Sequence, residues 1–187
     1  MEKKCGLKKN GYYKMNNLLL DLDETLISSY ETPSTSKPAD YVFHDGVVTW
    51  YIYKRPHLDE FLDYVFANFN VCIWTASEQD YCLGIVKNVI IGNHTERVLD
   101  YILFRYHCDV SESLYKNNNK SLRVLWDDFK IKGMSIDNCI LVDDRVDLKT
   151  VQPDCNVINV PRFYMNSYNA AKDTVLLDLI EQLKLLF

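Results

Sequence analysis

The sequence contains no uncharged apolar run that approaches the length of a transmembrane helix, so we expect no membrane span. It also lacks the apolar core of a secretory signal, because its first 16 residues carry five lysines among mostly polar neighbours. We interpret residues 1–16 as a flexible basic tail. A nuclear or cytoplasmic location is expected.

Motifs typical of a structural zinc site are missing as well. The six cysteines show no Cys-x-x-Cys spacing, and several lie inside apolar runs, as reduced thiols in a protein core do. His57 and His94 have no partner at a spacing that suits a metal ion. An excess of basic residues is also absent: the formal charge is −5 and the pI is about 5.3, which argues against direct binding of nucleic acid.

Glycine is scarce, with six residues in 187, whereas Asn, Tyr, Lys and Ile are abundant. This composition indicates an AT-rich genome, such as that of a parasite or a large DNA virus. The length fits one domain, and a hydrophobic content of 48% supports a globular core. We find no repeat or linker, and we expect residues 17–187 to form a single domain that acts as a monomer.

The stretch from Asn17 to Ser28, NLLLDLDETLIS, is the centre of the prediction. Its leucines at 18–20 have the pattern of a buried strand, which ends at two carboxylates, Asp21 and Asp23. Ionised carboxylates are rarely buried without a partner, so a bound cation would suit this position. The alternative is an acidic turn between a strand and a helix, in which an Asp or Thr side chain caps the helix.

Buried strands alternate with helical segments along the rest of the chain. The alternation predicts a three-layer, Rossmann-like α/β fold, with a mostly parallel sheet and helices on both faces. An Asp-Gly pair between two β-rich runs predicts a small β-hairpin inserted after the first strand, within residues 28–54. Further strands are expected at 41–44, 47–53, 70–74, 101–104, 139–142 and 156–160, helices at 56–66, 78–91, 122–129 and 173–187, and an irregular polar segment at 107–119.

Three predicted strands end in polar side chains, and the carboxyl ends of these strands would meet at one edge of the sheet. Carboxylates and a hydroxyl, without a histidine among them, suit a hard cation with oxygen ligands, above all Mg²⁺. The side chains are Asp21 and Asp23 after the first strand, Thr75 after the strand at 70–74, and Asp143 and Asp144 after the strand at 139–142.

This combination suits phosphoryl transfer, which depends mainly on positioning and on stabilisation of charge. A metal-bound Asp can attack phosphorus and form an aspartyl-phosphate, and a second acid nearby can protonate the leaving oxygen and later activate water. We therefore predict Asp21 as the nucleophile and Asp23 as the acid/base. Because the acids alone would repel a phosphate dianion, a further cation is expected, and Lys120 is the candidate.

DLDETL at 21–26, KRPHLDEFL at 54–62, WTAS at 74–77 and VDDR at 142–145 appear in this order. Together they resemble the FCP/SCP phosphatases, haloacid dehalogenase-like enzymes named for acting on the carboxy-terminal domain (CTD) of RNA polymerase II. The resemblance implies the same roles for Asp21 and Asp23. It also implies that Mg²⁺ is bound by the carboxylate of Asp21, the backbone carbonyl of Asp23, and Asp143 or Asp144.

The resemblance further implies that Thr75 and a lysine hold the phosphoryl group. The family's lysine usually precedes Asp-Leu or Pro-Leu, whereas Lys120 precedes Ser-Leu here. The residues that follow look like the branch that carries a ubiquitin-like domain, and this favours Lys120 over Lys116, Lys130 or Lys132. The remaining candidates for substrate binding are Thr25, Ser77, Arg55 and Arg145.

The size of the insertion bears on the substrate. A short hairpin leaves the site open to a peptide on a protein surface, so we expect phosphoserine or phosphothreonine proteins, with the RNA polymerase II CTD as one candidate. Two alternatives stay open at this point. One is a phosphatase that acts on a small molecule or on a nucleic-acid end, and the other is a non-catalytic module that binds phosphoproteins or peptides.

Overall fold

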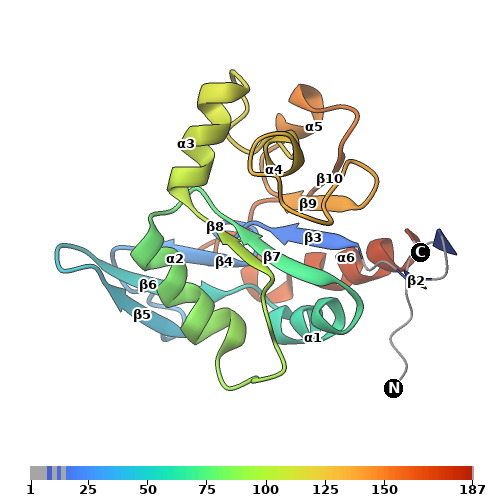
Figure 1. Ribbon diagram of the computed structural model, residues 1–187. Coiled ribbons are helices and arrows are strands. Elements are labelled where there is room, and N and C mark those ends of the chain that lie inside the picture. Colours follow the sequence, from blue (N-terminus) through green and yellow to red (C-terminus); the bar gives the residue numbers. More distant parts are fainter. Residues whose placement is uncertain (1–7, 10–11, 14–15, 187) are drawn as a thin grey trace.

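The centre of the molecule is a five-stranded parallel sheet, shown in Figure 1. The computed structural model describes residues 8–9, 12–13 and 16–186. In order across the sheet, the strands are β10 (Asn156–Asn159), β9 (Cys139–Asp143), β3 (Asn17–Leu20), β7 (Asn70–Trp74) and β8 (Tyr101–Leu103).

β3 is the middle strand of this sheet. Leu20 lies opposite Ile73 of β7 on one side and opposite Val142 of β9 on the other. The chain therefore winds from β3 outward to β8, returns to β9 and continues outward to β10. The direction of winding reverses between β3 and β9, and open α/β sheets bind ligands at such a point, beyond the carboxyl ends of the strands.

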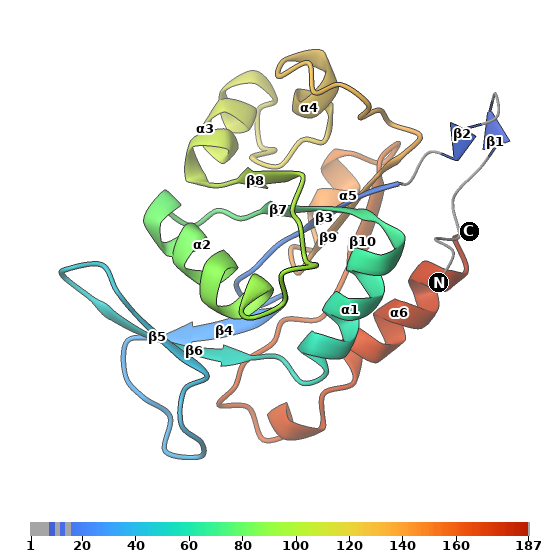
Figure 2. The same cartoon turned by 60° about the horizontal axis from the view of Figure 1, so that its bottom comes forward.

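Helices cover both faces of the sheet, as Figures 1 and 2 show, so the predicted three-layer α/β fold is confirmed. One face carries α1, α6, and α2 with its π-helical continuation η1. The helices α1 and α6 lie side by side, and the 3₁₀ turn η2 precedes α6. The other face carries α3, α4 and α5. The bounds are α1 (Leu58–Asn68), α2 (Gln79–Ile85), η1 (Val86–Ile91), α3 (Arg105–Leu114), α4 (Arg123–Asp127), α5 (Leu148–Val151), η2 (Ala170–Lys172) and α6 (Val175–Lys184).

The leucine run of β3 is continuous because both faces of the strand are covered. Leu18 and Leu20 pack in the apolar cluster that contains α1 and α6, whereas Leu19 packs in the cluster that contains α4 and α5. All three side chains are fully buried. A strand in this position has no polar face, and its first carboxylate comes only after Leu20.

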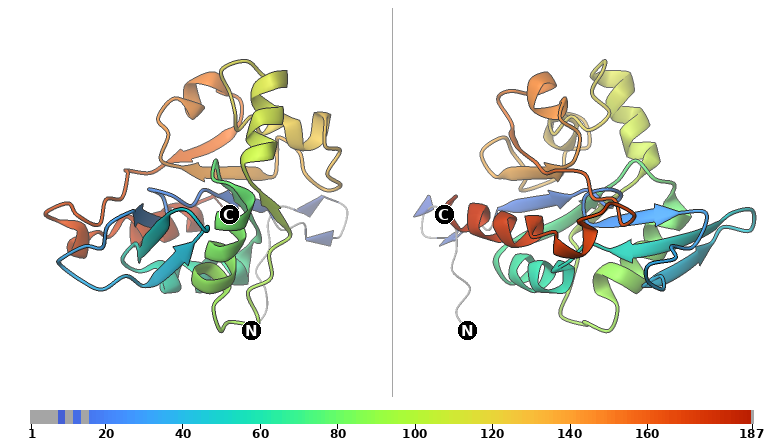
Figure 3. Two further views of the ribbon diagram at one scale, coloured as in Figure 1. Left: turned by 90° about the vertical axis from the view of Figure 1, so that its left-hand side faces the viewer. Right: turned by 180° about the vertical axis from the view of Figure 1, so that it is seen from behind.

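The insertion after β3 is a three-stranded antiparallel sheet rather than a two-stranded hairpin. The predicted hairpin is present as β5 (Tyr41–His44) and β6 (Thr49–Lys54), and its turn uses Gly46 at φ +92°. The additional strand, β4 (Ile27–Tyr30), pairs with β6, which lies in the middle of the small sheet. The short ISSY run carries no strong β pattern, and its pairing with β6 determines its conformation. Figure 3 shows this sheet beyond the carboxyl end of β3.

Other expectations need correction. The segment at 107–119, predicted to be irregular, is largely helical, because α3 begins at Arg105 and buries Cys108 and Ser111 three positions apart. The helix α5 was not predicted, and the C-terminal helix is shorter than residues 173–187. Most of the predicted tail, 1–16, lies outside the described residues, but β1 (Lys8–Lys9) and β2 (Tyr12–Tyr13) pair with each other.

The predicted core position of the thiols is confirmed for Cys72, Cys82 and Cys108, which are buried and form no disulfide. Burial raises the pKa of the Cys72 and Cys82 thiols to about 12, so neither is a reactive thiolate. Cys5 lies outside the described residues. Within the described part of the chain, no helix is long and apolar enough to cross a membrane.

Candidate active site

Three of the predicted acids meet at the carboxyl edge of the sheet. Asp21 follows β3, Asp143 is the last residue of the neighbouring β9, and Asp144 comes next. Each of the three offers a carboxylate oxygen that lies within 4.8 Å of the other two, and all three residues are buried. The parallel register of β3 and β9 brings these distant segments together.

Lys120 completes this group. Its Nζ lies 2.6 Å from Oδ1 of Asp21 and 2.7 Å from Oδ2 of Asp143, and the residue is only 2% exposed. Its backbone is held as well: Asn118 Oδ1 accepts a hydrogen bond from Lys120 N at 3.2 Å, and Gln152 Nε2 donates one to Lys120 O at 3.0 Å. The preceding asparagine run indicates a polar, exposed loop, yet the fold turns this lysine inward.

The group carries more negative than positive charge. Burial raises the pKa of Asp21 to about 7, against the opposing effect of Lys120, and Asp143 raises it further. Burial and Asp143 also raise the pKa of Asp144. In Lys120 the two carboxylates outweigh burial, so the pKa of the ammonium is raised. A second cation beside these acids would relieve their repulsion.

The donor set fits Mg²⁺. Asp21, Asp143 and Asp144 offer only carboxylate oxygens, which are the ligands that a hard divalent cation prefers. The carboxylate of Asp23 is not part of this group, so Asp23 could reach the same ion only through its backbone carbonyl.

Asp23 instead faces three hydroxyl groups. Ser77 Oγ donates a hydrogen bond to Oδ2 at 2.6 Å, and Tyr81 OH and Ser29 Oγ donate to Oδ1 at 2.7 and 3.2 Å. Ser77 was predicted as a site residue, but Tyr81 and Ser29 were missed. No local pattern marked Tyr81, which lies in the first turn of α2, whereas Ser77 precedes this helix. Ser29 contacts Asp23 because β4 folds back over the loop that follows β3.

Thr25 lies in the loop after β3, and Thr75 follows β7. The backbone turns at Leu22, whose carbonyl accepts the amide of Leu26 at 2.8 Å, and this returns Thr25 to the acids. Thr25 Oγ1 donates to Oδ2 of Asp21 at 2.8 Å and is fully buried, so it contacts the predicted nucleophile rather than open space. Thr75 follows β7, next to β3, and its Oγ1 accepts the amide of Ser77 at 3.1 Å.

Arg55, predicted as a substrate ligand, is not directed at the acids. Its Nε and Nη2 each lie 2.9 Å from the carboxylate of Asp173, and its Nη1 donates to the carbonyl of Thr25 at 3.0 Å. The residue is 1% exposed, and a buried guanidinium needs such partners. Arg55 therefore stabilises the loop after β3, which contains Asp21 and Asp23, through the backbone of Thr25.

Arg145 is likewise engaged with its own chain. Its guanidinium forms a double contact with the carboxylate of Asp147 and also contacts Asn119, the residue before Lys120. Its backbone amide donates to Oδ1 of Asp143 at 2.9 Å. The structure thus brings Arg145 to the edge of the site, where it supports the Lys120 loop and the β9 acid.

Arg162, which was not predicted as a site residue, contacts the acidic group. Its Nε lies 2.8 Å from Oδ2 of Asp144 and its Nη1 lies 3.3 Å from Glu24. No local pattern marks this arginine, which comes from the segment after β10. The Arg162 side chain is half-exposed, so its guanidinium pairs with Asp144 on the side of the acidic group that solvent can reach.

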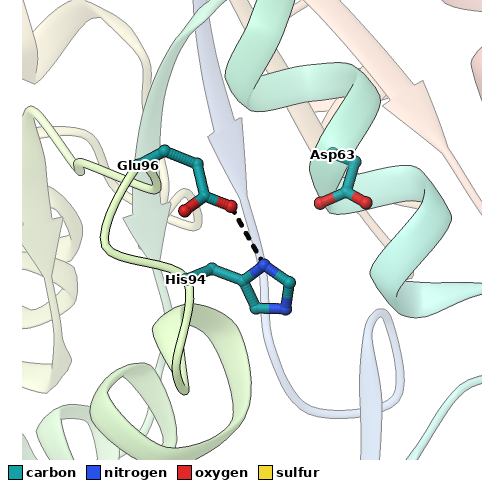
Figure 4. Close-up of side chains that lie close together, drawn as sticks. All are labelled: Asp63, His94 and Glu96. Carbon is teal, nitrogen blue, oxygen red and sulfur yellow. Dashed lines mark hydrogen bonds and ion pairs between the residues drawn. The ribbon is translucent and has the colours of Figure 1, made fainter.

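A second group of potential metal ligands consists of Asp63, His94 and Glu96 (Figure 4). From the sequence, His94 had no partner at a spacing that suits a metal ion, but the fold brings Asp63 of α1 near it. The group differs from the first because Asp63 and Glu96 are exposed. His94 Nδ1 lies 3.0 Å from Glu96, and Asp63 accepts a hydrogen bond from the Arg97 guanidinium at 2.8 Å. His94 and Glu96 lie in the segment between η1 and β8, and the group shares no residue with the acids around Asp21.

The chain matches, over residues 16–187, the model of a family described as NLI interacting factor-like phosphatase. The chain belongs to this family. Its relatives include CTD phosphatase-like protein 355R of Invertebrate iridescent virus 3, which is 37% identical over 175 residues, or 88% of this chain and 92% of the relative. The protein of the same name from Invertebrate iridescent virus 6 is 32% identical over 174 residues, or 88% and 95%.

Both viral relatives come from large DNA viruses, one of the sources that the composition indicated. CTD nuclear envelope phosphatase 1B of Danio rerio is 27% identical over 180 residues, or 91% of this chain and 66% of that protein. Among solved structures, Fcp1, an essential RNA polymerase II CTD phosphatase, has a TM-score of 0.61 at 24% identity. The match covers 90% of this chain, which spans half the length of that Fcp1 chain, and it shows the fold.

The predicted resemblance to the FCP/SCP phosphatases is therefore confirmed at the level of the family. The family is one of phosphatases, and the fold of this chain is similar to that of Fcp1.

Proposed function

We propose that the protein is a Mg²⁺-dependent phosphatase that hydrolyses phosphoserine or phosphothreonine on proteins through an aspartyl-phosphate on Asp21. One observation carries this proposal: Asp21 is buried at the carboxyl end of the central strand, within reach of a lysine and two further acids. A purely structural carboxylate has no need of this surplus of negative charge around it.

Asp21, Asp143 and Asp144 would hold the Mg²⁺ ion. Bound there, the ion would offset the charge of the acids and stabilise negative charge on the phosphoryl oxygens. Lys120 would hold the phosphoryl group together with Thr75, because an ammonium and a hydroxyl both donate hydrogen bonds to phosphate oxygens. Thr25 keeps the Asp21 carboxylate in one orientation through its 2.8 Å hydrogen bond.

In the first step, an oxygen of Asp21 attacks phosphorus and forms the new P–O bond as the bond to the serine or threonine oxygen breaks. Asp23 donates its proton to that leaving oxygen. In the second step, Asp23 takes a proton from water, the water oxygen attacks phosphorus, and the bond to Asp21 breaks to release inorganic phosphate. The hydroxyls of Ser29, Ser77 and Tyr81 hold Asp23 in place during both steps.

A protein substrate is favoured by the small size of the insertion. The three-stranded sheet of β4, β5 and β6 stands beside the site, and a recess beside Asp23 stays open to solvent. Names of relatives refer to CTD phosphatases, so the RNA polymerase II CTD is one candidate substrate. We expect phosphopeptides to be better substrates than free sugar or nucleotide phosphates.

The test is hydrolysis of para-nitrophenyl phosphate at mildly acidic pH, with Mg²⁺ and with excess chelator. Wild type is compared with Asp21→Asn and with Asp127→Asn, a matched control on α4 whose carboxylate is partly exposed and pairs with Arg123. We expect activity that needs Mg²⁺, is lost in Asp21→Asn and is kept in Asp127→Asn. Acid-quenched wild type given ³²P-labelled phosphopeptide should carry label, and Asp21→Asn should carry none.

The outcomes separate the alternatives. Hydrolysis that survives in Asp21→Asn would refute the proposed nucleophile. Turnover of nucleotide or sugar phosphates that exceeds turnover of phosphopeptides would favour a small-molecule phosphatase. A folded wild type that hydrolyses none of these esters would favour a non-catalytic phosphopeptide-binding module.

A further inference from the structure

Asp23 lies at one end of a recess of about 590 Å³ between the small sheet and the start of α2. Ser29 and Ser77, both bonded to Asp23, lie in the same wall. In the proposed reaction Asp23 protonates the leaving oxygen, so the part of the substrate attached to that oxygen must pass beside it. The recess is thus the natural place for the residues next to the phosphorylated one, and the inference drawn from it rests on the proposed function.

The rim of the recess is acidic. Asp45, from the turn between β5 and β6, lines the recess together with Glu78 and Asp80 at the N-terminal end of α2, and all three are exposed. No Lys, Arg or His stands among the described residues that line the recess. Within the part of the chain that the structure describes, Glu78 is the only one of the three acids in an ion pair, and its carboxylate lies 3.4 Å from Arg105 Nε.

Asp45 is fixed in position at this rim. Its Oδ1 accepts the backbone amides of Val47 and Val48 at 2.8 and 2.6 Å. These hydrogen bonds lower the pKa of Asp45, so its charge is present at neutral pH. The rim therefore has a permanent negative charge held by the hairpin turn, not by a mobile loop end.

The deeper part of the recess is aromatic. Phe43, Trp50 and Tyr81 are less exposed than the acids, and the rings of Phe43 and Trp50 lie edge-on to Tyr81 at centroid distances of 5.5 and 6.1 Å. Gly84 of α2 permits this packing, because a Cβ there would come within 2.9 Å of the Phe43 ring. Aromatic surface beside carboxylates matches a long alkyl chain that ends in a cation.

We propose that this recess selects phosphoprotein segments that carry a lysine or arginine close to the phosphorylated residue. The alkyl stem of that side chain lies along Phe43 and Trp50, and its charged group lies between the carboxylates of Asp45 and Asp80. A segment of uncharged residues would leave the rim without a counter-charge. A basic phosphosite is consequently a better substrate than a neutral one.

The test uses three phosphoserine peptides that differ at one position, two residues after the phosphoserine, which carries Lys, Gln or Glu. Wild type is compared with a triple variant, Asp45→Asn with Glu78→Gln and Asp80→Asn, and with Asp127→Asn as the control carboxylate outside the recess. The amide substitutions keep an acceptor oxygen and so preserve the turn at Asp45. The readout is the ratio of kcat/KM for the Lys and Gln peptides within each protein, which cancels any general loss of activity.

For wild type we expect a Lys-to-Gln ratio of about ten, since exposed charge pairs are each worth only a few-fold and three acids act together. The ratio should shrink in 0.5 M salt, stay the same in Asp127→Asn and fall to about two or less in the triple variant. Equal kcat/KM for the Lys and Gln peptides in wild type would overturn the inference. So would a preference that persists in the triple variant.

Two small substrates distinguish a peptide site from a site for a small cationic ester. Phosphoethanolamine offers a cation without a peptide, and turnover that matches the Lys peptide would overturn the inference in favour of a small cationic ester. Para-nitrophenyl phosphate offers neither. If wild type hydrolyses it but shows no preference among peptides, only the inference fails, whereas absence of hydrolysis of every ester would refute the proposed function itself.

Discussion

Lys120→Met offers the sharpest test of the acidic group. The substitution keeps a long apolar side chain but removes the ammonium that lies 2.6 Å from Asp21 and 2.7 Å from Asp143. Both carboxylates are buried, with exposed side-chain fractions of 7% and 1%, so water cannot replace the lost charge. In metal-free protein, the variant would leave these acids together without a counter-ion.

The expected cost follows from the burial of the pair. Removal of one partner of a buried ion pair lowers the free energy of unfolding by about 3–5 kcal/mol, because the remaining charge stays desolvated. For a chain of this size, about 4 kcal/mol corresponds to a fall in Tm of about 8–16 °C. Mg²⁺ should restore part of this loss, since a cation among the same carboxylates supplies the missing charge.

The assay is thermal unfolding followed by circular dichroism at pH 7.5, with chelator and with Mg²⁺. Hydrolysis of para-nitrophenyl phosphate is measured in parallel, and Lys120→Met should lose about 100-fold or more, as expected for removal of a charge on the transferred group. Lys116→Met is the matched control, because Lys116 lies in the same loop region but is exposed.

Two results would refute this reasoning. One is a Lys120→Met protein that melts within about 2 °C of wild type in chelator, since a shift below 1 kcal/mol is too small for a buried pair. The other is an equal loss in Lys116→Met, which would mean that the loop, not the ammonium, matters.

Three further predictions concern residues around the site and the core. Tyr81→Phe removes one hydroxyl from Asp23, so we expect kcat for para-nitrophenyl phosphate to fall about tenfold with an altered pH profile. Arg55→Met removes the guanidinium from Asp173 and from the Thr25 carbonyl, and urea titration should show a loss of about 3 kcal/mol. Burial lowers the pKa of His107, so unfolded protein takes up the proton first and stability falls as pH drops below about 6.5. His107→Gln should therefore lose less stability than wild type between pH 7.5 and 5.5.

Each of these predictions has a control elsewhere on the surface. Tyr106→Phe should leave kcat unchanged, and an equal fall there would contradict the role given to Tyr81. Arg123→Met should cost less than about 1 kcal/mol, because its pair with Asp127 is exposed. If His44→Gln altered the acid sensitivity as much as His107→Gln, the partly buried His107 imidazole would not be the cause.

Much of the fold could be predicted because its signals are local. The run Leu18 to Leu20 is apolar on both faces, and a strand of that kind belongs in a covered parallel sheet. The Asp-Gly pair at 45–46 marks the hairpin turn, since Gly46 adopts φ +92°. The helix α3 was not predicted because its local signal is weak. Most of its residues are polar, and within it only Cys108 and Ser111 are buried.

The candidate site divides in a similar way. Acids that end the strands at 17–20 and 139–143 could be paired from the sequence, because parallel strands bring their carboxyl ends to one edge. Arg55 could not be assigned from the sequence, since its partner Asp173 comes from a segment that only the folded chain brings near. Arg145 pairs with the nearby Asp147, but its contact with Asn119 likewise depends on the fold. A charged residue within a motif does not reveal which charge it will meet.

The sequence alone therefore determined the five strands of the central sheet, the acids at the strand ends and the resemblance to a phosphatase family, because each strand, strand end and motif has a local residue pattern. The tertiary structure decided which polar side chains are buried and which partners they have. Lys120 follows three asparagines and would be expected in solvent, yet the fold buries it between Asp21 and Asp143. The reason is physical: a buried charge is stable only beside a counter-charge. For Lys120, one of these counter-charges is Asp21, which lies 99 residues away along the chain.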